Sequence, residues 1–483
     1  MKRLVLLAVY PIAACIAQLP GTFAVTGGMS VPRVAHTATL LYGGNVLIAG
    51  GYSIFSGSVT PFPSAELYDP VRATFSPTGN MTATRAYHTA TLLPDGRVLI
   101  AGGYYFLADQ GFTVASSAEI YDPARGAFIG TGGMATPRMG HSATLLNDGR
   151  VLIAGGVLNG YAIASAEIYD PVTGMFTPTG DMTIGRTGHI ATLLPDGKVF
   201  IAPGDDGPDY RTADIYDPVR GVFHAVNWHS SNLTAGSASL LPNGKLLFTL
   251  QPPEGDFDSK LATLYDVSTA LFEDTAPMEV PSYWPSSTVL SDGSVLLTGT
   301  DAGCGSGAQN TEFYDAAAAA FFSLANMTAA RSGHTATLLE DGTVLVAGGR
   351  GTSGCPPLAL ASAERFTPPS IAPPPVLLSS SGANQGAILH AGTSRIVSGA
   401  DPAVAGEILE VYFTGLLEHS AIPPRVSVGG RLAEVLYFGN APGFAGLNQI
   451  DIRVPGGVAP GPAIPVRLMY LGRHSNQVTI GVQ

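Results

Sequence analysis

A stretch from His88 to Gly103, HTATLLPDGRVLIAGG, recurs in recognisable copies along most of this chain of 483 residues. Small polar and apolar residues alternate in its first half, Pro94-Asp95-Gly96 has turn chemistry, and Val98 to Ala101 is a short apolar run before two glycines. This pattern predicts a hairpin whose second strand is buried on both faces. Because SAEIYDP (117–123) and GAF (126–128) follow, each unit offers four short strands.

The repeats recur at a period near 50 residues. The third strand of each unit is marked by an aromatic residue, and these are Tyr68, Tyr121, Tyr169, Tyr216, Tyr265, Tyr314 and Phe366. A single four-stranded sheet of this kind cannot bury its own faces, so the copies must stack in a ring. The 60 glycines, 37 prolines and 12% charged residues also fit short strands and tight turns. We therefore predict an all-β, seven-bladed β-propeller.

The fourth strand indicates how the ring closes. Six units have this strand, but Pro368-Pro369 follows Phe366 in the seventh. The missing copy lies at the other end of the chain, where GTFAVTGGM (21–29) resembles GAFIGTGGM (126–134). We expect the N-terminal strand to complete the last blade.

Over Phe23 to Phe366, the combination of Arg-x-x-His, an apolar strand, a double glycine and Tyr-Asp-Pro resembles the Kelch repeat. The resemblance implies a Kelch-type propeller over residues 21–367. It does not specify a function, because Kelch propellers serve as protein adaptors, carbohydrate-binding proteins and oxidases.

A proline-rich linker (368–375) separates the predicted propeller from residues 376–483, where Val/Ile-rich strands alternate with Pro/Gly turns. Their number and spacing predict an immunoglobulin-like β-sandwich. The run from Val426 to Gly461, with HSNQVTIGVQ at the end, resembles the uncharacterised C-terminal module of secreted acidobacterial proteins. This resemblance implies export.

Residues 1–17 have the pattern of an export signal, with Lys2 and Arg3 before an apolar run. Two cleavage positions fit: one after Ala17, and one before Cys15, which would then carry a lipid. We expect an extracellular or cell-surface protein that contacts the membrane only through an acylated Cys15. The net charge of −12 and the lack of a basic cluster argue against a nucleic-acid partner.

Arginine and histidine recur at matching positions in five units. The pairs are Arg33/His36, Arg85/His88, Arg138/His141, Arg186/His189 and Arg331/His334. Because a ligand site is rarely repeated around a ring, we interpret them as blade-to-blade hydrogen-bonding groups and not as metal ligands. The Asp-Gly and Asp-Pro pairs are interpreted as turn formers.

Units four to six depart from the repeat, which suggests a binding surface on their variable loops. Aromatic rings beside carboxylates suit a glycan or peptide ligand. The candidate binding residues are Trp228, His229, Tyr283, Trp284, Asp205, Asp206 and Asp301. In the alternative, these blades are degenerate and their large rings fill space.

Two further features of these loops concern metal and disulfide chemistry. The acidic runs 205–209 and 254–258 lack the spacing of a calcium loop. Cys304 and Cys355 follow the second strands of units six and seven at similar offsets, so we expect them to form a disulfide in an exported protein.

The main functional hypothesis is a non-enzymatic binding protein that docks a glycan or protein partner and uses no cofactor. An alternative comes from resemblance, since galactose-oxidase-like copper enzymes also join a Kelch propeller to an immunoglobulin-like domain. Their chemistry implies a tyrosine cross-linked to a cysteine, a second tyrosine and two histidines. Here Cys304, Cys355 and, in the C-terminal part, His474 are the residues to consider. A structural envelope or spacer protein is the third hypothesis.

Overall fold

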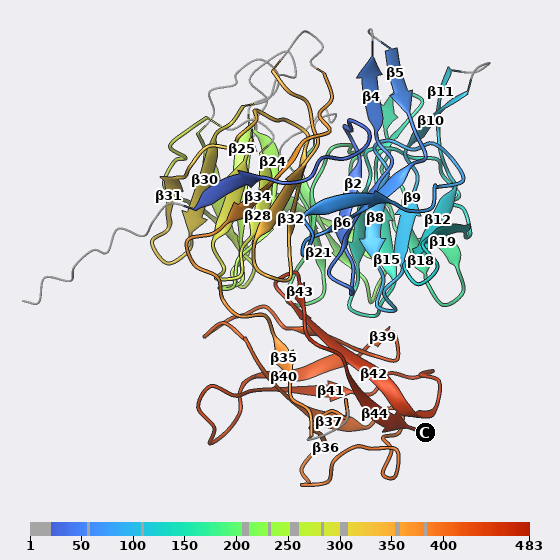
Figure 1. Ribbon diagram of the computed structural model, residues 1–483, viewed down its shortest axis with the longest axis vertical. Helices are drawn as coiled ribbons and strands as arrows, with labels where there is room; N and C mark the ends of the chain where they lie inside the picture. The colour runs from blue at the N-terminus through green and yellow to red at the C-terminus, as the bar shows by residue number, and fades with distance from the viewer. Residues whose placement is uncertain are drawn as a thin grey trace, which may run out of the picture.

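The computed structural model describes residues 21–55, 58–107, 111–204, 212–229, 233–251, 260–281, 285–299, 308–352, 358–380 and 384–483. This part of the chain is built from β-strands, and none of it forms a helix long and apolar enough to cross a membrane. Figure 1 shows two bodies: a large ring of sheets and, beside it, a smaller body formed by the last hundred or so residues.

The ring contains four-stranded antiparallel sheets, which we number in chain order. Sheet 1 consists of β2 (Thr37–Leu40), β3 (Val46–Ala49), β6 (Ala65–Asp69) and β7 (Thr74–Pro77); sheet 2 of β8 (Thr89–Leu92), β9 (Val98–Ala101), β12 (Ala118–Asp122) and β13 (Ala127–Gly130). Sheet 3 consists of β14 (Ser142–Leu145), β15 (Val151–Ala154), β18 (Ala166–Asp170) and β19 (Met175–Pro178); sheet 4 of β20 (Ala191–Leu193), β21 (Val199–Ile201), β22 (Thr212–Asp217) and β23 (Val222–Asn227). Sheet 5 consists of β24 (Thr234–Leu240), β25 (Lys245–Gln251), β26 (Ala262–Asp266) and β27 (Leu271–Asp274); sheet 6 of β28 (Ser286–Val289), β29 (Val295–Thr298), β30 (Thr311–Asp315) and β31 (Ala320–Ser323). Sheet 7 consists of β32 (Thr335–Leu338), β33 (Val344–Ala347), β34 (Ala363–Thr367) and β1 (Thr22–Val25).

The sheets surround a central axis, as in a β-propeller. The first strands of successive sheets contact one another in chain order, and β32 of sheet 7 contacts β2 of sheet 1. The predicted closure is confirmed, because β1 pairs with β34 in the register Phe23 to Phe366 and Val25 to Glu364. The two ends of the ring are therefore joined in one sheet.

The apolar second strands occupy the interior, as their composition predicts. All residues of β3, β9, β15 and β33 are buried. Separate apolar clusters fill the space between adjacent sheets; in one of them Ala49 of sheet 1 packs with Ile100 and Tyr121 of sheet 2. Sheets that are buried on both faces explain why these strands are continuously apolar rather than alternating.

The repeated histidines link neighbouring sheets, as expected. His88 Nε2 lies 3.1 Å from Thr37 Oγ1 of sheet 1, and His36 Nε2 lies 3.1 Å from Thr335 Oγ1 across the closure. The double glycine makes room for this contact, since a Cβ on Gly50 would lie 2.9 Å from His88 Cε1 and 2.5 Å from the Arg85 carbonyl oxygen. These residues are therefore parts of the scaffold.

The arginine side chains differ from the expectation, because each bonds within its own sheet. Arg85 Nη2 donates to Glu119 Oε1 at 3.0 Å, and its Nη1 donates to the Gly102 carbonyl at 2.9 Å. The same carboxylate accepts a hydrogen bond from the backbone N–H of Thr82, a residue of the segment that leads into the sheet. The buried guanidinium thus fastens the entering segment to its own sheet, and only its backbone carbonyl reaches the preceding one.

Three two-stranded ribbons project from one end of the ring. They are β4 (Tyr52–Phe55) with β5 (Ser58–Pro61), β10 (Tyr104–Leu107) with β11 (Gly111–Val114), and β16 (Val157–Leu158) with β17 (Tyr161–Ala162). Figure 1 shows β4, β5, β10 and β11 at the end farthest from the C-terminal body. The variable loops predicted between second and third strands therefore share one face.

The C-terminal body has two five-stranded sheets around one apolar core. One sheet contains β35 (Val376–Leu377), β36 (Ile388–His390), β37 (Ile408–Thr414), β40 (Glu434–Asn440) and β41 (Asn448–Arg453). The other contains β38 (Arg425–Val428), β39 (Arg431–Leu432), β42 (Gly461–Tyr470), β43 (Arg473–His474) and β44 (Val478–Val482).

The C-terminal body packs on the end of the propeller that carries the Asp-Gly turns. Arg473 Nε donates to the Glu340 carbonyl at 2.9 Å, and His474 Nδ1 lies 2.6 Å from Glu340 Oε1. The Ala421 N–H donates to the Pro242 carbonyl at 2.6 Å. In the described part of the chain, the C-terminal body does not contact the opposite end, which carries the ribbons (Figure 1).

Candidate functional site

An axial pocket of about 350 Å³ opens at the end of the propeller that carries the ribbons. Its walls come from residues at or just before the start of the first strands of sheets 1, 2, 5, 6 and 7, and from Arg350, which follows the second strand of sheet 7. The lining residues are Val34, Ala35, Tyr87, Gly236, Pro285, Ser286, Ser332, Gly333, His334 and Arg350. A pocket at this position draws its side chains from several sheets, so it can be asymmetric even in a repetitive scaffold.

Three tyrosines from sheets 1 and 2 form a cluster beside this pocket, which we call the tyrosine cluster. The ring centroids of Tyr52 and Tyr87 are 6.0 Å apart, and those of Tyr87 and Tyr104 are 5.8 Å apart. Arg350 Nη2 donates to Tyr52 Oη at 2.5 Å, and the hydroxyls of Tyr52 and Tyr87 are 3.5 Å apart. The cluster thus presents hydroxyls and aromatic edges together with a guanidinium.

Tyr87 has a strained backbone. Its φ is 52°, and the equivalent positions before the repeated histidine have φ values of 61° at Gly140, 60° at Gly188, 57° at Gly333 and 52° at Ala35, which also carries a Cβ. A left-handed backbone favours glycine and costs a bulky residue roughly 1–3 kcal/mol. Strain of this kind is often found at functional sites. The Tyr87 side chain is also 43% exposed, so packing in a core does not explain why a tyrosine stands at this position.

The surroundings of Tyr87 and Tyr104 favour the neutral form of these two phenols. Although part of its ring is exposed, desolvation of the hydroxyl, followed by the neighbouring Tyr52, raises the pKa of Tyr87 above its usual value. Burial raises the pKa of Tyr104 in the same direction, with smaller contributions from Tyr52 and Tyr87. At neutral pH these hydroxyls therefore keep their protons and can donate hydrogen bonds to a substrate oxygen.

The expectation that Trp228 forms a ligand-stacking surface is wrong. Its ring is 6% exposed and packs among Phe200, Phe248 and Phe272, while its Nε1–H donates to the Leu233 carbonyl at 2.8 Å. Sheet 5 has leucine at position 233 in place of the repeated arginine, and the indole fills the core between sheets 4 and 5. The space-filling alternative holds for this residue.

His229 lies beside the outer strand of sheet 5 and away from the axis. Its Nε2 is 3.0 Å from Asp274 Oδ1, and its ring packs at 5.6 Å from that of Phe272. The structure therefore does not bring His229 into the axial pocket.

The other candidates fall outside the described residues. They are Asp205, Asp206, Tyr283, Trp284, Asp301, the cysteine pair Cys304 and Cys355, and Cys15 with the rest of the export signal. The acidic runs 205–209 and 254–258 also lie there.

The described residues do not fit the copper ligand set that the galactose-oxidase resemblance implies. None of them forms a group of three or more His, Cys, Asp or Glu able to hold a metal ion. The repeated histidines use Nε2 on hydroxyls of neighbouring sheets, and burial lowers the pKa of His36, His88 and His334 to about 3. His474 binds Glu340 at the opposite end of the ring. The repeated histidines and His474 are thus engaged elsewhere in the scaffold and do not supply the two histidines of that ligand set.

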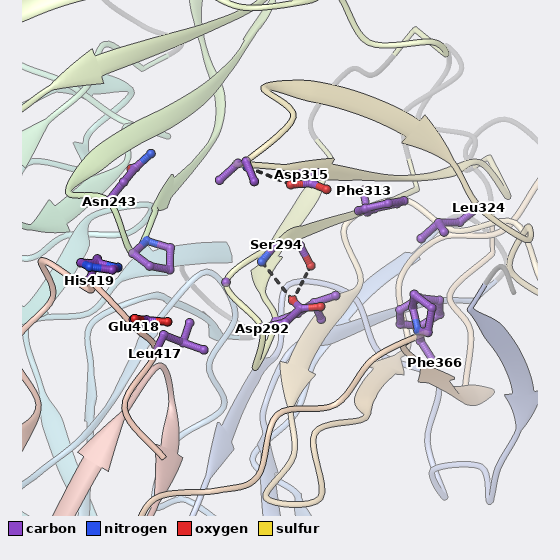
Figure 2. A pocket seen from close by; sticks show the side chains of 16 residues that line it. Asn243, Asp292, Ser294, Phe313, Asp315, Leu324, Phe366, Leu417, Glu418 and His419 are labelled. Atoms are coloured by element: carbon purple, nitrogen blue, oxygen red, sulfur yellow. Dashed lines mark hydrogen bonds between the residues drawn. The ribbon is translucent and has the colours of Figure 1, made fainter. Parts of the chain in front are cut away.

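A second cavity, of about 540 Å³, lies between the turns of sheets 5 to 7 and the loop that contains His419. Figure 2 shows the carboxylates of Asp292 and Asp315 in this cavity, bonded to nearby groups of the chain. Asp292 Oδ1 accepts hydrogen bonds from the Ser294 N–H at 3.0 Å and hydroxyl at 2.6 Å, and Asp315 Oδ1 accepts one from the Ala317 N–H at 2.8 Å. These acids hold their own turns, which confirms the turn-forming interpretation.

Sequence reasoning missed the tyrosine cluster, although the chain contained a signal for it. Tyr87 stands where three repeats have glycine, and Tyr52, Tyr104 and Arg350 directly follow their double glycines. A tyrosine at a position where other repeats have glycine is a departure from the repeat, which is the same signal that pointed to units four to six.

Comparisons with known proteins identify oxidases. No family model matches the chain. Two curated galactose oxidase sequences from Gibberella zeae are each 34% identical over 107 residues, which is 22% of this chain and 15% of theirs. A solved structure of a fungal alcohol oxidase of the AA5 family, in complex with copper, matches with a TM-score of 0.62 and 16% identity, covering 96% of this chain and 99% of that one. The structural likeness shows that the two chains share a fold.

These similarities contradict the main expectation of a non-enzymatic glycan- or protein-binding protein. Both the sequence match and the structural match are to oxidases, so they favour the oxidase alternative. The chain spans a small share of the curated relatives' length, and activity is therefore a matter for proposal.

Proposed function

We propose that this protein is a galactose-oxidase-like oxidase that acts on alcohol groups, with its substrate bound in the axial pocket. The observation that carries the proposal is the tyrosine cluster at the mouth of the axis, in a fold that aligns with a copper-containing alcohol oxidase over 96% of the chain. In such a reaction the alcohol carbon and hydroxyl lose two electrons and two protons, and dioxygen takes them up to give hydrogen peroxide.

The residues of this chain would bind and orient the substrate. The neutral Tyr87 hydroxyl donates to a substrate oxygen, and its exposed ring edge packs against the carbon skeleton. Arg350 holds Tyr52 in place through the 2.5 Å hydrogen bond. Because the described residues lack the copper ligand set, binding and orientation are the roles that the structure supports for them.

As part of this proposal, the ring is a seven-bladed Kelch-type propeller over residues 21–367, joined through 368–375 to an immunoglobulin-like domain over 376–483. Seven described sheets and the two-sheet C-terminal core support this assignment. The charged-then-apolar pattern of residues 1–17 supports action outside the cell.

Oxygen uptake and peroxide release test the proposal, measured with galactose and a panel of primary alcohols on protein with and without added Cu(II). Mass spectrometry of the purified protein gives its metal content. We expect substrate-dependent uptake with one peroxide per dioxygen. Tyr87→Phe should lower kcat/KM about tenfold, the worth of one substrate hydrogen bond of about 1.4 kcal/mol.

Tyr161→Phe is the matched control, since Tyr161 lies on β17 at the same end of the ring and is exposed. Its kcat/KM should equal that of the wild type. Absence of oxygen uptake with every alcohol, in both copper-loaded and copper-free protein, would refute the oxidase proposal.

A further inference from the structure

The outer face of one C-terminal sheet carries polar side chains in register. In β38 and β42, Val426, Val466 and Leu468 point into the apolar core. Side chains alternate along a strand, so Arg425, Ser427 and Arg467 lie on the opposite face. Ser427 pairs directly with Arg467, and Arg425 lies two residues before Ser427.

This face is turned toward the propeller, and its two arginines stay partly exposed. A cavity of about 260 Å³, which we call the junction cavity, lies between the two bodies. Its propeller side is formed by turns and first strands of sheets 1 to 3, and its C-terminal side by the face just described. The polar lining residues are Tyr42, Thr91, Arg425, Ser427, Arg467 and His474.

Arg425 is a cation without an anionic partner within the described structure. Its one hydrogen bond runs from Nη2 to the Leu145 carbonyl at 3.2 Å. Burial lowers the pKa of Arg425 to about 10, which means that its charge is poorly solvated. A buried guanidinium is normally compensated by a carboxylate or phosphate.

Two neighbours add further capacity to bind an anion. Arg467 lies over the ring of Tyr42 at 5.1 Å and donates from Nη2 to Gln477 Oε1 at 2.8 Å. His474 is held by Glu340 through Nδ1, while its Nε2 is buried without a hydrogen-bond partner among the described residues. The nearby carboxylates are occupied, since Glu340 binds His474 and Asp95 binds Arg97.

We propose that the junction cavity binds a small oxyanion, a carboxylate or phosphate group, between the propeller and the C-terminal body. Arg425 and Arg467 supply the positive charge. Ser427 Oγ is placed to donate a further hydrogen bond. His474 Nε2 lines the same cavity and can donate as well only when the ring carries a second proton, because Nδ1 already donates to Glu340. The planar forks of arginine suit this ligand, because they match the geometry of both groups. Since its ligands come from the C-terminal body and its walls from the propeller, the anion would bind only the docked arrangement.

Thermal unfolding of the full chain tests this proposal, with inorganic phosphate or malonate titrated against chloride at constant ionic strength. We expect a saturable rise in Tm with at least one of the two probes. A lower Kd for phosphate would indicate a phosphate ligand, and a lower Kd for malonate would indicate a carboxylate ligand. In Arg425→Gln the Kd should rise at least about tenfold. Arg395→Gln is the control, because Arg395 is exposed and pairs with Asp401.

A comparison in chloride alone separates binding from a structural role of the arginine. Arg425 is a partly buried charge without a carboxylate partner among the described residues, so Arg425→Gln should be at least as stable as the wild type without the anion. If Arg425→Gln does not fold, Arg467→Gln and Ser427→Ala are titrated in its place and should weaken binding. The proposal is overturned if neither probe raises Tm in the wild type, or if the variants respond as strongly as the wild type.

Discussion

Replacing Tyr87 by glycine and by alanine separates the backbone strain at the axial pocket from the contacts of the ring. The φ of 52° places this tyrosine where equivalent repeats have glycine. A left-handed backbone costs a residue with a Cβ about 1–2 kcal/mol, and this cost remains in Tyr87→Ala but disappears in Tyr87→Gly. Both variants lose the same ring.

The size of each effect follows from the structure. The two ring contacts of Tyr87, at 6.0 and 5.8 Å, are tilted and partly exposed, so their loss costs about 1 kcal/mol in total. Glycine also adds about 0.5–1 kcal/mol of unfolded-chain entropy. Tyr87→Gly should thus match the wild-type stability to within about 1 kcal/mol, and Tyr87→Ala should be about 1 kcal/mol less stable than Tyr87→Gly.

Urea unfolding at pH 7 measures this order, and the peroxide assay shows that both variants have lost the Tyr87 contribution to turnover. Gly333→Ala is the matched control in sheet 7, where φ is 57° and the new Cβ would lie 3.9 Å from Val34 Cγ1. Because space is available, its net loss should be at most about 1.5 kcal/mol, which is the strain of about 1–2 kcal/mol less the unfolded-chain entropy that alanine removes. If Tyr87→Ala proves as stable as Tyr87→Gly, the strain argument is refuted.

Three further changes test the scaffold. Burial lowers the pKa of the five repeated histidines, so below pH 6.5 the unfolded chain binds more protons than the folded chain. The free energy of unfolding should therefore fall with decreasing pH by up to about 1.4 kcal/mol per histidine per pH unit. In His88→Gln, urea unfolding between pH 6.5 and 5 should show a pH dependence smaller by the contribution of about one proton. Burial raises the pKa of Glu312, whose repeated arginine partner is replaced by Ser282, so the protonated form is favoured when folded and stability is lost as pH rises through that pKa. Glu312→Gln should therefore stabilise the protein at pH 8 and have no such effect at pH 4, and equal gains at both values would contradict this account. Deleting residues 21–29 removes β1 and the buried Met29, which should cost at least about 2–5 kcal/mol and lower Tm, whereas an unchanged Tm would argue against the closure.

Much of the scaffold could be predicted because it depends on local pattern and repetition. The apolar second strands, the Asp-Gly turns and the pairing of GTFAVTGGM with the last sheet follow from residue spacing. The histidine contacts between sheets follow from their recurrence. The within-sheet role of the arginines could not be predicted, since their partners lie about 30 positions away and are chosen by the register of the third strand.

The candidate site was harder to predict than the scaffold. Aromatic content suggested Trp228, but an indole in sheet 5 finds more apolar contact in the core than on the surface. Tyr87, by contrast, is one of many tyrosines in the sequence. Its position becomes significant only when the ring brings sheets 1, 2 and 7 around one axis and places Arg350 beside Tyr52.

The sequence by itself determined that strands alternate with turns at a period near 50, and which side chains of each strand face a core. In RVSV (425–428) and VRLMY (466–470) the alternation already separates valine and leucine from arginine and serine. Only the tertiary structure decided that the arginine face is turned toward the propeller. The physical reason is that a two-residue period distinguishes the two faces of a sheet, whereas what covers the outer face depends on segments hundreds of residues away.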